Sequence, residues 1–233
     1  MRSPPVSKAI KGEVIPYYDV AVLGDKSSGK SSIVERLISG SFTQTYTPTA
    51  AENYMTTLHD GNRRVACLQI FDTAGRFEFP VMLRLTITKC QAFMIVYSVD
   101  SVESLEVAKQ KIEEIKNIKG KSVPCVLVGN KKDLKNQRQI TFEAGLQIAV
   151  QYGCAFIETS ASEDRDVDDA FLSLVKKIEF TEEAKRQMFR EQRSPSEIRE
   201  EKRKIKRKNS VKRFIINLSN TFSSDSEDSS DEL

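Results

Sequence analysis

The feature that most constrains the fold is an alternation of two kinds of segment between residues 17 and 180. Short runs rich in β-branched residues alternate with longer stretches in which apolar residues recur every three or four positions. This order is typical of a mostly parallel sheet with helices on both faces. Strands are expected at residues 19–24, 52–59, 64–71, 91–98, 123–129 and 155–158.

The same pattern predicts the helices and one departure from parallel pairing. Asp60, Gly61 and Asn62 separate the second and third expected strands and form a sequence typical of a hairpin turn. The expected fold is therefore an α/β sheet of six strands, mostly parallel, with one antiparallel edge strand. Helices are expected at residues 30–39, 102–118, 142–152 and 166–180.

Length and composition predict one domain with two extensions. A chain of 233 residues with 39% hydrophobic residues can form one sizeable core. We expect a flexible N-terminal extension at 1–16, a single domain at 17–180 and a charged C-terminal tail at 181–233. The tail has too few apolar residues to offset the entropy of ordering. Its basic segment, 199–213, and its acidic segment, 225–232, are averaged out in the net charge of +3.

Cysteine spacing and hydropathy exclude several classes of protein. The four cysteines lie in or beside apolar runs without a CxxC pair, so we expect buried reduced thiols rather than disulfides or a zinc site. No apolar run is long enough to span a bilayer and no secretory signal is readable, so we expect a cytosolic protein. The single histidine, His59, is accompanied by no partner carboxylate or nucleophile pattern, which excludes a Ser-His-Asp hydrolase.

The first expected strand runs directly into a loop with the pattern GxxxxGK[ST], and a helix is expected after it. Glycines let successive N–H groups point at phosphate oxygens, and the helix presents its positive end to the same anion. Lys30 is expected to bridge the β and γ phosphates, and the Ser31 hydroxyl to bind Mg²⁺. The alternative is a Gly/Ser turn before an ordinary helix. The expected binding residues here are Gly24, Asp25, Lys26, Ser27, Ser28, Gly29, Lys30, Ser31 and Ser32.

Three further motifs follow expected strands at the edge where a doubly wound sheet places its ligand. The first is Asp-Thr-Ala-Gly, in which Asp72 is a hard oxygen donor suited to Mg²⁺ and Gly75 can offer its N–H to a γ phosphate. The second is Asn-Lys-Lys-Asp, with Asn130, Lys131 and Asp133. The Asp133 carboxylate can accept two hydrogen bonds from the guanine edge, which adenine does not offer.

The third motif is Thr-Ser-Ala after the last strand, where a backbone N–H of Ser160 or Ala161 can meet the guanine oxygen. Each motif alone also occurs in ordinary turns and helix entries. All four in this order predict a site for GTP or GDP with Mg²⁺.

With these motifs, residues 16–180 resemble the domain of a Ras-family small GTPase, a small G domain of the P-loop NTPase class. The resemblance implies that Thr49 completes a metal set with Ser31 and Asp72 and senses the γ phosphate. It also implies that Phe42 packs edge-on against guanine. Residues 45–54 and 75–86 would be the two switch segments, which γ phosphate orders.

The chain departs from the family at the positions that favour hydrolysis. Arg76 follows Asp-Thr-Ala-Gly where the family's hydrolases have glutamine, and guanidinium donates hydrogen bonds but cannot accept one from the attacking water. Lys26 replaces a glycine and crowds the space of that water. The catalytic candidates are Lys30 and Arg76. Because of the two substitutions, we expect slow hydrolysis; the alternative is that Arg76 compensates electrostatically. Ala50 replaces a bulky apolar residue, so the usual Ras effectors are not expected to bind.

Two functions of different class remain open: a GTP-dependent signalling switch with impaired hydrolysis, and a scaffold that holds nucleotide permanently and works through its tail. A nucleotide kinase is a third alternative, but the Asn-Lys-Lys-Asp motif has no role in such an enzyme.

The basic segment of the tail suggests a second interaction site, since a cluster at 202–213 precedes apolar residues on one helical face. An anionic membrane such as the inner face of the plasma membrane, calmodulin and nuclear import factors are the candidate partners, beside a simply solvated run. No lipid anchor is readable, because residue 2 is Arg and the last cysteine is Cys154. We expect a monomer that binds no nucleic acid, with effectors and exchange factor unidentified.

Overall fold

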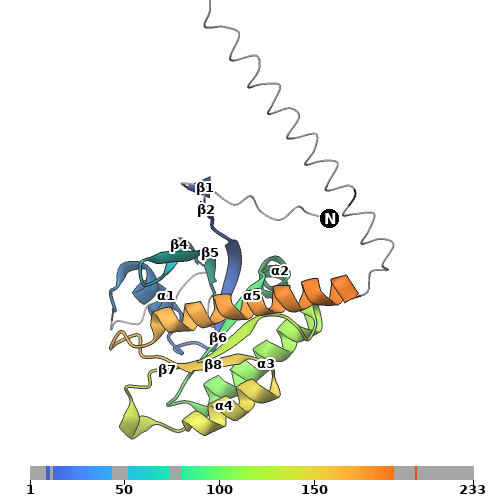
Figure 1. The fold of residues 1–233 in the computed structure, drawn as a ribbon. Helices are drawn as coiled ribbons and strands as arrows, with labels where there is room; N and C mark the ends of the chain where they lie inside the picture. The colour runs from blue at the N-terminus through green and yellow to red at the C-terminus, as the bar shows by residue number, and fades with distance from the viewer. Residues whose placement is uncertain (1–8, 11–12, 44–51, 74–79, 192–202, 204–233) are drawn as a thin grey trace, which may run out of the picture. The chain divides into compact units, whose positions relative to one another are not determined.

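A computed structural model of the chain describes residues 9–10, 13–43, 52–73, 80–191 and 203. Six strands form one sheet in the order β4-β5-β3-β6-β7-β8, and all neighbours are parallel except the antiparallel pair β4 and β5 (Figure 1). The expected α/β sheet with one antiparallel edge strand is thereby confirmed. The strands of this sheet are β3 (Tyr17–Gly24), β4 (Glu52–Asp60), β5 (Arg63–Asp72), β6 (Ala92–Ser98), β7 (Cys125–Asn130) and β8 (Ala155–Glu158).

The helices cover both faces of the sheet (Figure 1). Alternate residues of β3 point to opposite faces, so Val20 and Val22 belong to one core cluster while Ala21 and Leu23 belong to another. The first cluster includes residues of α1 and α5, and the second includes residues of α2, α3 and α4. The helices are α1 (Lys30–Ser39), α2 (Pro80–Lys89), α3 (Val102–Lys119), α4 (Phe142–Gln151) and α5 (Val167–Glu191).

The central strands are buried and the edge strands are not. Every residue of β6 and β7 is buried, which explains their continuous apolar sequences. β4 exposes most of its residues, and its register with β5 shifts between Leu58 and His59. Gly61, at φ +56°, forms the expected hairpin turn between these two strands.

Some elements differ from the sequence-based expectation. α2, which the structure describes from Pro80 to Lys89, was not predicted. α5 was expected to end at Phe180 and continues to Glu191, because its charged second half consists largely of good helix formers. Two short elements also escaped prediction: the two-stranded sheet of β1 (Ala9–Ile10) and β2 (Glu13–Val14), and the 3₁₀ turn η1 (Lys135–Gln137).

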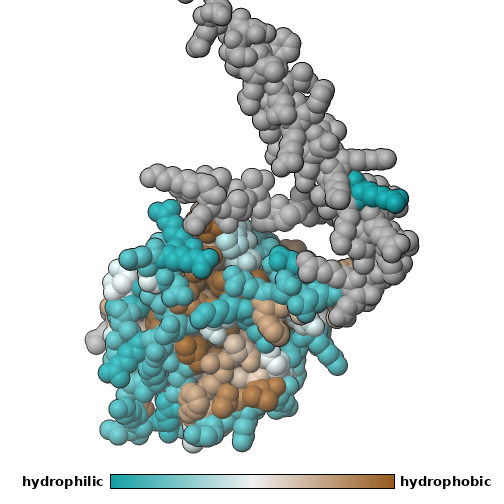
Figure 2. Space-filling model, viewed as in Figure 1, coloured by the Kyte–Doolittle hydropathy of each residue, from teal (hydrophilic) through white to brown (hydrophobic). Residues whose placement is uncertain are grey.

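The four cysteines are free thiols: Cys90 and Cys125 are buried, whereas Cys67 and Cys154 are half-buried. None of the described helices is both long and apolar enough to cross a membrane. In the view of Figure 2 the surface is mainly hydrophilic, with an apolar area on the face that carries α4 and β8. On α4, Phe142, Leu146 and Val150 are exposed at intervals of four residues.

Candidate functional site

The loop between β3 and α1 has a backbone that only glycine tolerates at two points. Gly24 has φ +146°, and a Cβ there would lie 2.0 Å from the Val96 carbonyl oxygen. Gly29 has φ +90°, and a Cβ there would lie 2.1 Å from Nδ2 of Asn130. Both spacings are far inside van der Waals contact, so the sequence pattern of this loop is required by its shape. Ser27 also has a positive φ, 58°, and the three residues together curl the loop over the start of α1.

Lys30, the first residue of α1, lies folded back into this loop. Its Nζ donates to the Asp25 carbonyl oxygen at 2.7 Å, and the Ser28 hydroxyl donates to the same oxygen at 2.9 Å. The side chain is buried, and this burial lowers the pKa of Lys30 to about 8, although Asp72 and Asp25 act in the opposite direction. The loop therefore holds an ammonium group whose charge its own surroundings do not fully compensate.

Asp72, the last residue of β5, lies beside the loop because β5 pairs with β3 in the register Val22↔Asp72. Its carboxylate is buried, and in the described part of the chain neither oxygen has a hydrogen bond of standard geometry. Burial raises the pKa of Asp72, while the Ser31 hydroxyl and the Lys30 ammonium partly offset that rise. A buried acceptor group left without ordinary partners is the arrangement expected where a cation binds.

These residues fit Mg²⁺ and a phosphorylated ligand. A carboxylate and a hydroxyl are hard oxygen donors, and Mg²⁺ is held in proteins by one or two such groups together with phosphate oxygens. Within the described ranges no three His, Cys, Asp or Glu side chains cluster as a metal cage would require. The predicted third metal ligand, Thr49, lies outside the described residues, as do Gly75 and Arg76.

Asn130, the last residue of β7, links three of the four predicted motifs from a fully buried position. Its Nδ2 donates to the Ser28 carbonyl oxygen at 3.0 Å. Its Oδ1 accepts from the Thr159 hydroxyl at 3.2 Å and from the Ala161 N–H at 3.4 Å. One side chain thus connects the phosphate loop to the loop after β8. Such a link fixes the distance between these two loops.

Asp133 and Ser160 also meet, since the Ser160 hydroxyl donates to Oδ1 of Asp133 at 2.6 Å. The remaining carboxylate oxygen, Oδ2, keeps acceptor capacity for two donors of a base edge. Lys132, the residue before Asp133, forms an ion pair with Asp166, and its N–H donates to the Thr159 carbonyl oxygen. The segment after β7 and the segment after β8 are therefore joined by side-chain and main-chain bonds.

The other predicted residues have more peripheral places. Lys26 is exposed on the phosphate loop, and Ser32 is half-buried in the first turn of α1. Lys131 has φ +64° and lies 3.9 Å from Asp100 through Nζ and Oδ2. Phe42 is half-buried and packs against the core cluster that contains α1.

Sequence reasoning missed two contributors, Thr73 and Arg36. The Thr73 hydroxyl donates to the Val22 carbonyl oxygen at 2.7 Å and fastens the end of β5 to β3. Arg36 contacts the loop after β8, 125 residues further along the chain. Neither has a local signal: a threonine after a strand is common, and an arginine in the last turn of a helix is ordinary.

Comparisons with known proteins agree with this geometry. Residues 19–180 match the Ras family model. The GTP-binding protein Di-Ras2 of Mus musculus is 41% identical over 160 residues, which are 68% of this chain and 80% of that protein. The GTP-binding protein drn-1 of Caenorhabditis elegans is 38% identical over 161 residues, 68% of this chain and 74% of that protein. Ras-like protein 1 of Saccharomyces cerevisiae is 35% identical over 162 residues, 69% and 52% of the two chains. The chain therefore belongs to the Ras family of small GTPases.

Proposed function

We propose that this chain is a signalling switch that binds GTP or GDP with Mg²⁺ and hydrolyses GTP slowly. The observation that carries the proposal is the hydrogen bond from Asn130 to the Ser28 carbonyl oxygen, because it joins a phosphate loop to a guanine-type motif in one buried arrangement. The relatives drn-1 and Di-Ras2, both named as GTP-binding proteins, support the choice of nucleotide.

In this proposal each part of the site has a distinct task. The N–H groups of the loop and the Lys30 ammonium hold the phosphate oxygens, and the buried Asp72 with Ser31 provides oxygen ligands for the metal. When bound, Mg²⁺ neutralises charge on the phosphate oxygens. Asp133 selects guanine over adenine through its carboxylate, and Ser160 orients that carboxylate through a 2.6 Å hydrogen bond.

Slow hydrolysis is proposed from two side chains. Lys26 is exposed on the phosphate loop, where the family usually has glycine, and its long side chain crowds the approach of water. Arg76 replaces the glutamine that orients the attacking water, and guanidinium has no acceptor atom. We expect an intrinsic rate below the order of 10⁻⁴ per second that unaided Ras shows.

Single-turnover hydrolysis of radiolabelled GTP tests this expectation. The double variant Lys26→Gly with Arg76→Gln should raise the rate by at least about tenfold, since it restores both space and a water acceptor. A matched control, Lys121→Gly with Arg63→Gln, removes one lysine and one arginine charge at exposed positions outside the phosphate loop and both switch segments, and should leave the rate unchanged. A wild-type rate at or above that of unaided Ras would contradict the impaired-hydrolase proposal and favour electrostatic compensation by Arg76.

The switch is distinguished from a permanently loaded scaffold by the nucleotide itself. The purified protein is denatured and the released nucleotide is identified by chromatography. Nucleotide that excess GDP displaces before denaturation supports the switch, whereas nucleotide that excess GDP cannot displace supports the permanently loaded scaffold.

We further propose that the chain acts in the cytoplasm and that its basic tail, 199–213, binds the anionic inner face of the plasma membrane. Each basic residue near such a surface contributes about 1 kcal/mol, so the cluster can hold the protein there reversibly. The support is the charge density of the sequence; apart from Arg203 the segment lies outside the described residues.

Co-sedimentation of the full chain with vesicles tests the tail. Vesicles with phosphatidylserine should pellet the protein in a salt-dependent manner, and pure phosphatidylcholine vesicles should not. A variant with Lys204, Lys206 and Lys208 changed to Glu should stay in solution. Equal behaviour on both vesicle types would end the membrane proposal, and calcium-dependent capture by calmodulin alone would replace it.

A further inference from the structure

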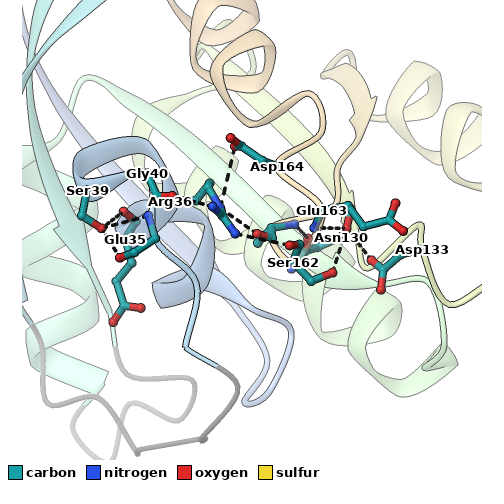
Figure 3. Close-up of polar contacts among 12 residues, drawn as sticks. Glu35, Arg36, Ser39, Gly40, Asn130, Asp133, Ser162, Glu163 and Asp164 are labelled. Carbon is teal, nitrogen blue, oxygen red and sulfur yellow. Dashed lines mark hydrogen bonds and ion pairs between the residues drawn. The ribbon is translucent and has the colours of Figure 1, made fainter.

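One arginine of α1 is fastened to the loop that follows β8 (Figure 3). Nε of Arg36 donates to the Ala161 carbonyl oxygen at 2.8 Å, and Nη2 donates to the Ser162 carbonyl oxygen at 3.3 Å. The planar guanidinium fork thus holds two successive peptide groups of one loop. Arg36 fixes the orientation of the segment that starts at Ala161.

The other end of the same guanidinium reaches the segment that leaves α1. Nη1 donates to the Gly40 carbonyl oxygen at 2.5 Å, and Cζ lies 6.0 Å from the centre of the Phe42 ring. Gly40 itself, at φ +65°, ends α1 by donating its N–H to the Arg36 carbonyl oxygen. Arg36 therefore links the end of α1, the start of the Phe42 segment and the loop after β8.

Burial and charge show which of these contacts are strong. The Arg36 side chain is 12% exposed, and its hydrogen bond to the Ala161 carbonyl oxygen is partly shielded from water, whereas its bonds to Gly40 and Ser162 are exposed. Its ion pair with Asp164 is long, 3.7 Å, and the Asp164 side chain is 64% exposed, so this pair contributes little. Loss of the carbonyl contacts, rather than of the ion pair, should therefore loosen the loop after β8.

The loop that Arg36 holds carries two groups of the proposed guanine site. The Ala161 N–H lies 3.4 Å from Oδ1 of Asn130, and Ser160 donates to Asp133 at 2.6 Å. A guanidinium bound to the carbonyl oxygen of Ala161 restrains the peptide groups on either side of this residue. It therefore restrains the position of the N–H that the guanine oxygen would meet.

We infer that Arg36 is a positioning residue for the guanine end of the nucleotide, which slows nucleotide dissociation by holding the Ser160–Ala161 segment and the Phe42 segment together. The inference rests on the proposed function, because it presupposes that this chain binds guanine nucleotide. Arg36 itself has no contact with the Asp133 carboxylate or with Lys30 among the described interactions, so it acts through the loop.

The test is the release rate of a fluorescent GDP from the full chain, measured after addition of excess unlabelled GDP. Arg36→Ala should release GDP about tenfold faster than the wild type, which is the change expected when roughly one charge-assisted hydrogen bond is lost. The release rate of Arg36→Lys should lie between those of Arg36→Ala and the wild type, because the point charge of lysine cannot hold several carbonyl groups at once. The control Arg165→Ala removes an exposed arginine that pairs with Glu163 in the same region and should change the rate less than twofold.

Two further measurements separate positioning from a general loss of stability. On an Asp133→Ala background, where the base contact is already lost, the effect of Arg36→Ala should shrink below about threefold. When Mg²⁺ is removed with a chelator, which loosens only the phosphate end, the tenfold effect should persist. If Arg36 only stabilised the fold, Arg36→Ala would accelerate GDP release equally on the wild-type and Asp133→Ala backgrounds. The nucleotide-free Arg36→Lys variant would then also unfold at a lower temperature than the nucleotide-free wild type.

The outcomes also separate this inference from the proposed function. If the wild type fails to bind GDP, the proposed function fails. If the wild type binds GDP and both Arg36 variants release it at the wild-type rate, only the positioning role is overturned. A tenfold effect that Asp133→Ala does not reduce overturns it as well.

Discussion

Lys30 offers the sharpest physical prediction, because its environment in the phosphate loop is costly for a charge. Burial lowers its pKa to about 8, so the free protein loses the Lys30 proton in an accessible pH range. A phosphate anion beside the ammonium favours the charged form and raises this pKa again. Nucleotide binding should therefore take up a proton at alkaline pH.

The magnitude follows from the pKa. A group with a pKa of about 8 in the free protein is about one-tenth deprotonated at pH 7, one-half at pH 8 and nine-tenths at pH 9. If the bound form stays protonated throughout, GDP binding takes up about 0.5 proton at pH 8 and about 0.9 at pH 9. The sign is fixed: affinity is fully present below pH 7 and falls as pH rises through 8, by about tenfold between pH 7 and pH 9.

The assay is titration calorimetry with GDP in two buffers of different ionisation enthalpy at pH 7, 8 and 9. The second pKa of a phosphate ester is about 6, so the ligand itself takes up almost no proton at pH 8 and above. Lys30→Arg is the control, since guanidinium does not deprotonate in this range and proton uptake should vanish. Uptake below about 0.2 proton at pH 9 in the wild type, or undiminished uptake in Lys30→Arg, would show that Lys30 is not the group that takes up the proton.

The remaining predictions concern the links that hold the site in shape. Asn130→Ala removes three buried hydrogen bonds and should lower the free energy of unfolding by about 3 kcal/mol in urea denaturation; a loss below about 1 kcal/mol would show that these bonds are weak. Gly24→Ala places a Cβ 2.0 Å from the Val96 carbonyl oxygen and should cost more than about 2 kcal/mol and most GDP binding. Gly61→Ala is its control, because Gly61 also has a positive φ, +56° against +146° for Gly24, but has open space where a Cβ would lie; a comparable loss there would contradict the steric explanation.

The sheet and the main site motifs were predictable from sequence because their signals are local. β6 and β7 are continuous apolar runs, and the phosphate loop combines a strand, two glycines and a helix start within a few residues. The glycines of that loop are explained by contacts with Val96 and Asn130, which lie far along the chain, but their pattern is readable without those contacts.

Other elements lacked such local signals. α2 exposes Val81, Met82 and Leu85 to solvent, so its apolar residues do not mark a single buried face. The second half of α5 has few apolar residues to set a period, and β1 and β2 are only two residues long.

The role of Arg36 was not readable because it is purely tertiary. Its partner Ala161 lies 125 residues away, and nothing in the sequence around α1 indicates that the arginine points towards that loop. Asp72 shows the opposite case, where the motif was recognised but only the structure shows a buried carboxylate without ordinary hydrogen bonds.

A buried network around Asn130 joins the phosphate loop to the segment of Asp133, the carboxylate proposed to select guanine. The most direct measurement is titration calorimetry of the nucleotide-free chain with GTP and with ATP in the presence of Mg²⁺. We expect tight binding of GTP and at least about a thousandfold weaker binding of ATP, because adenine does not offer the two donors that the Asp133 carboxylate would accept from guanine. Equal affinity for the two nucleotides, or binding of neither, would contradict it.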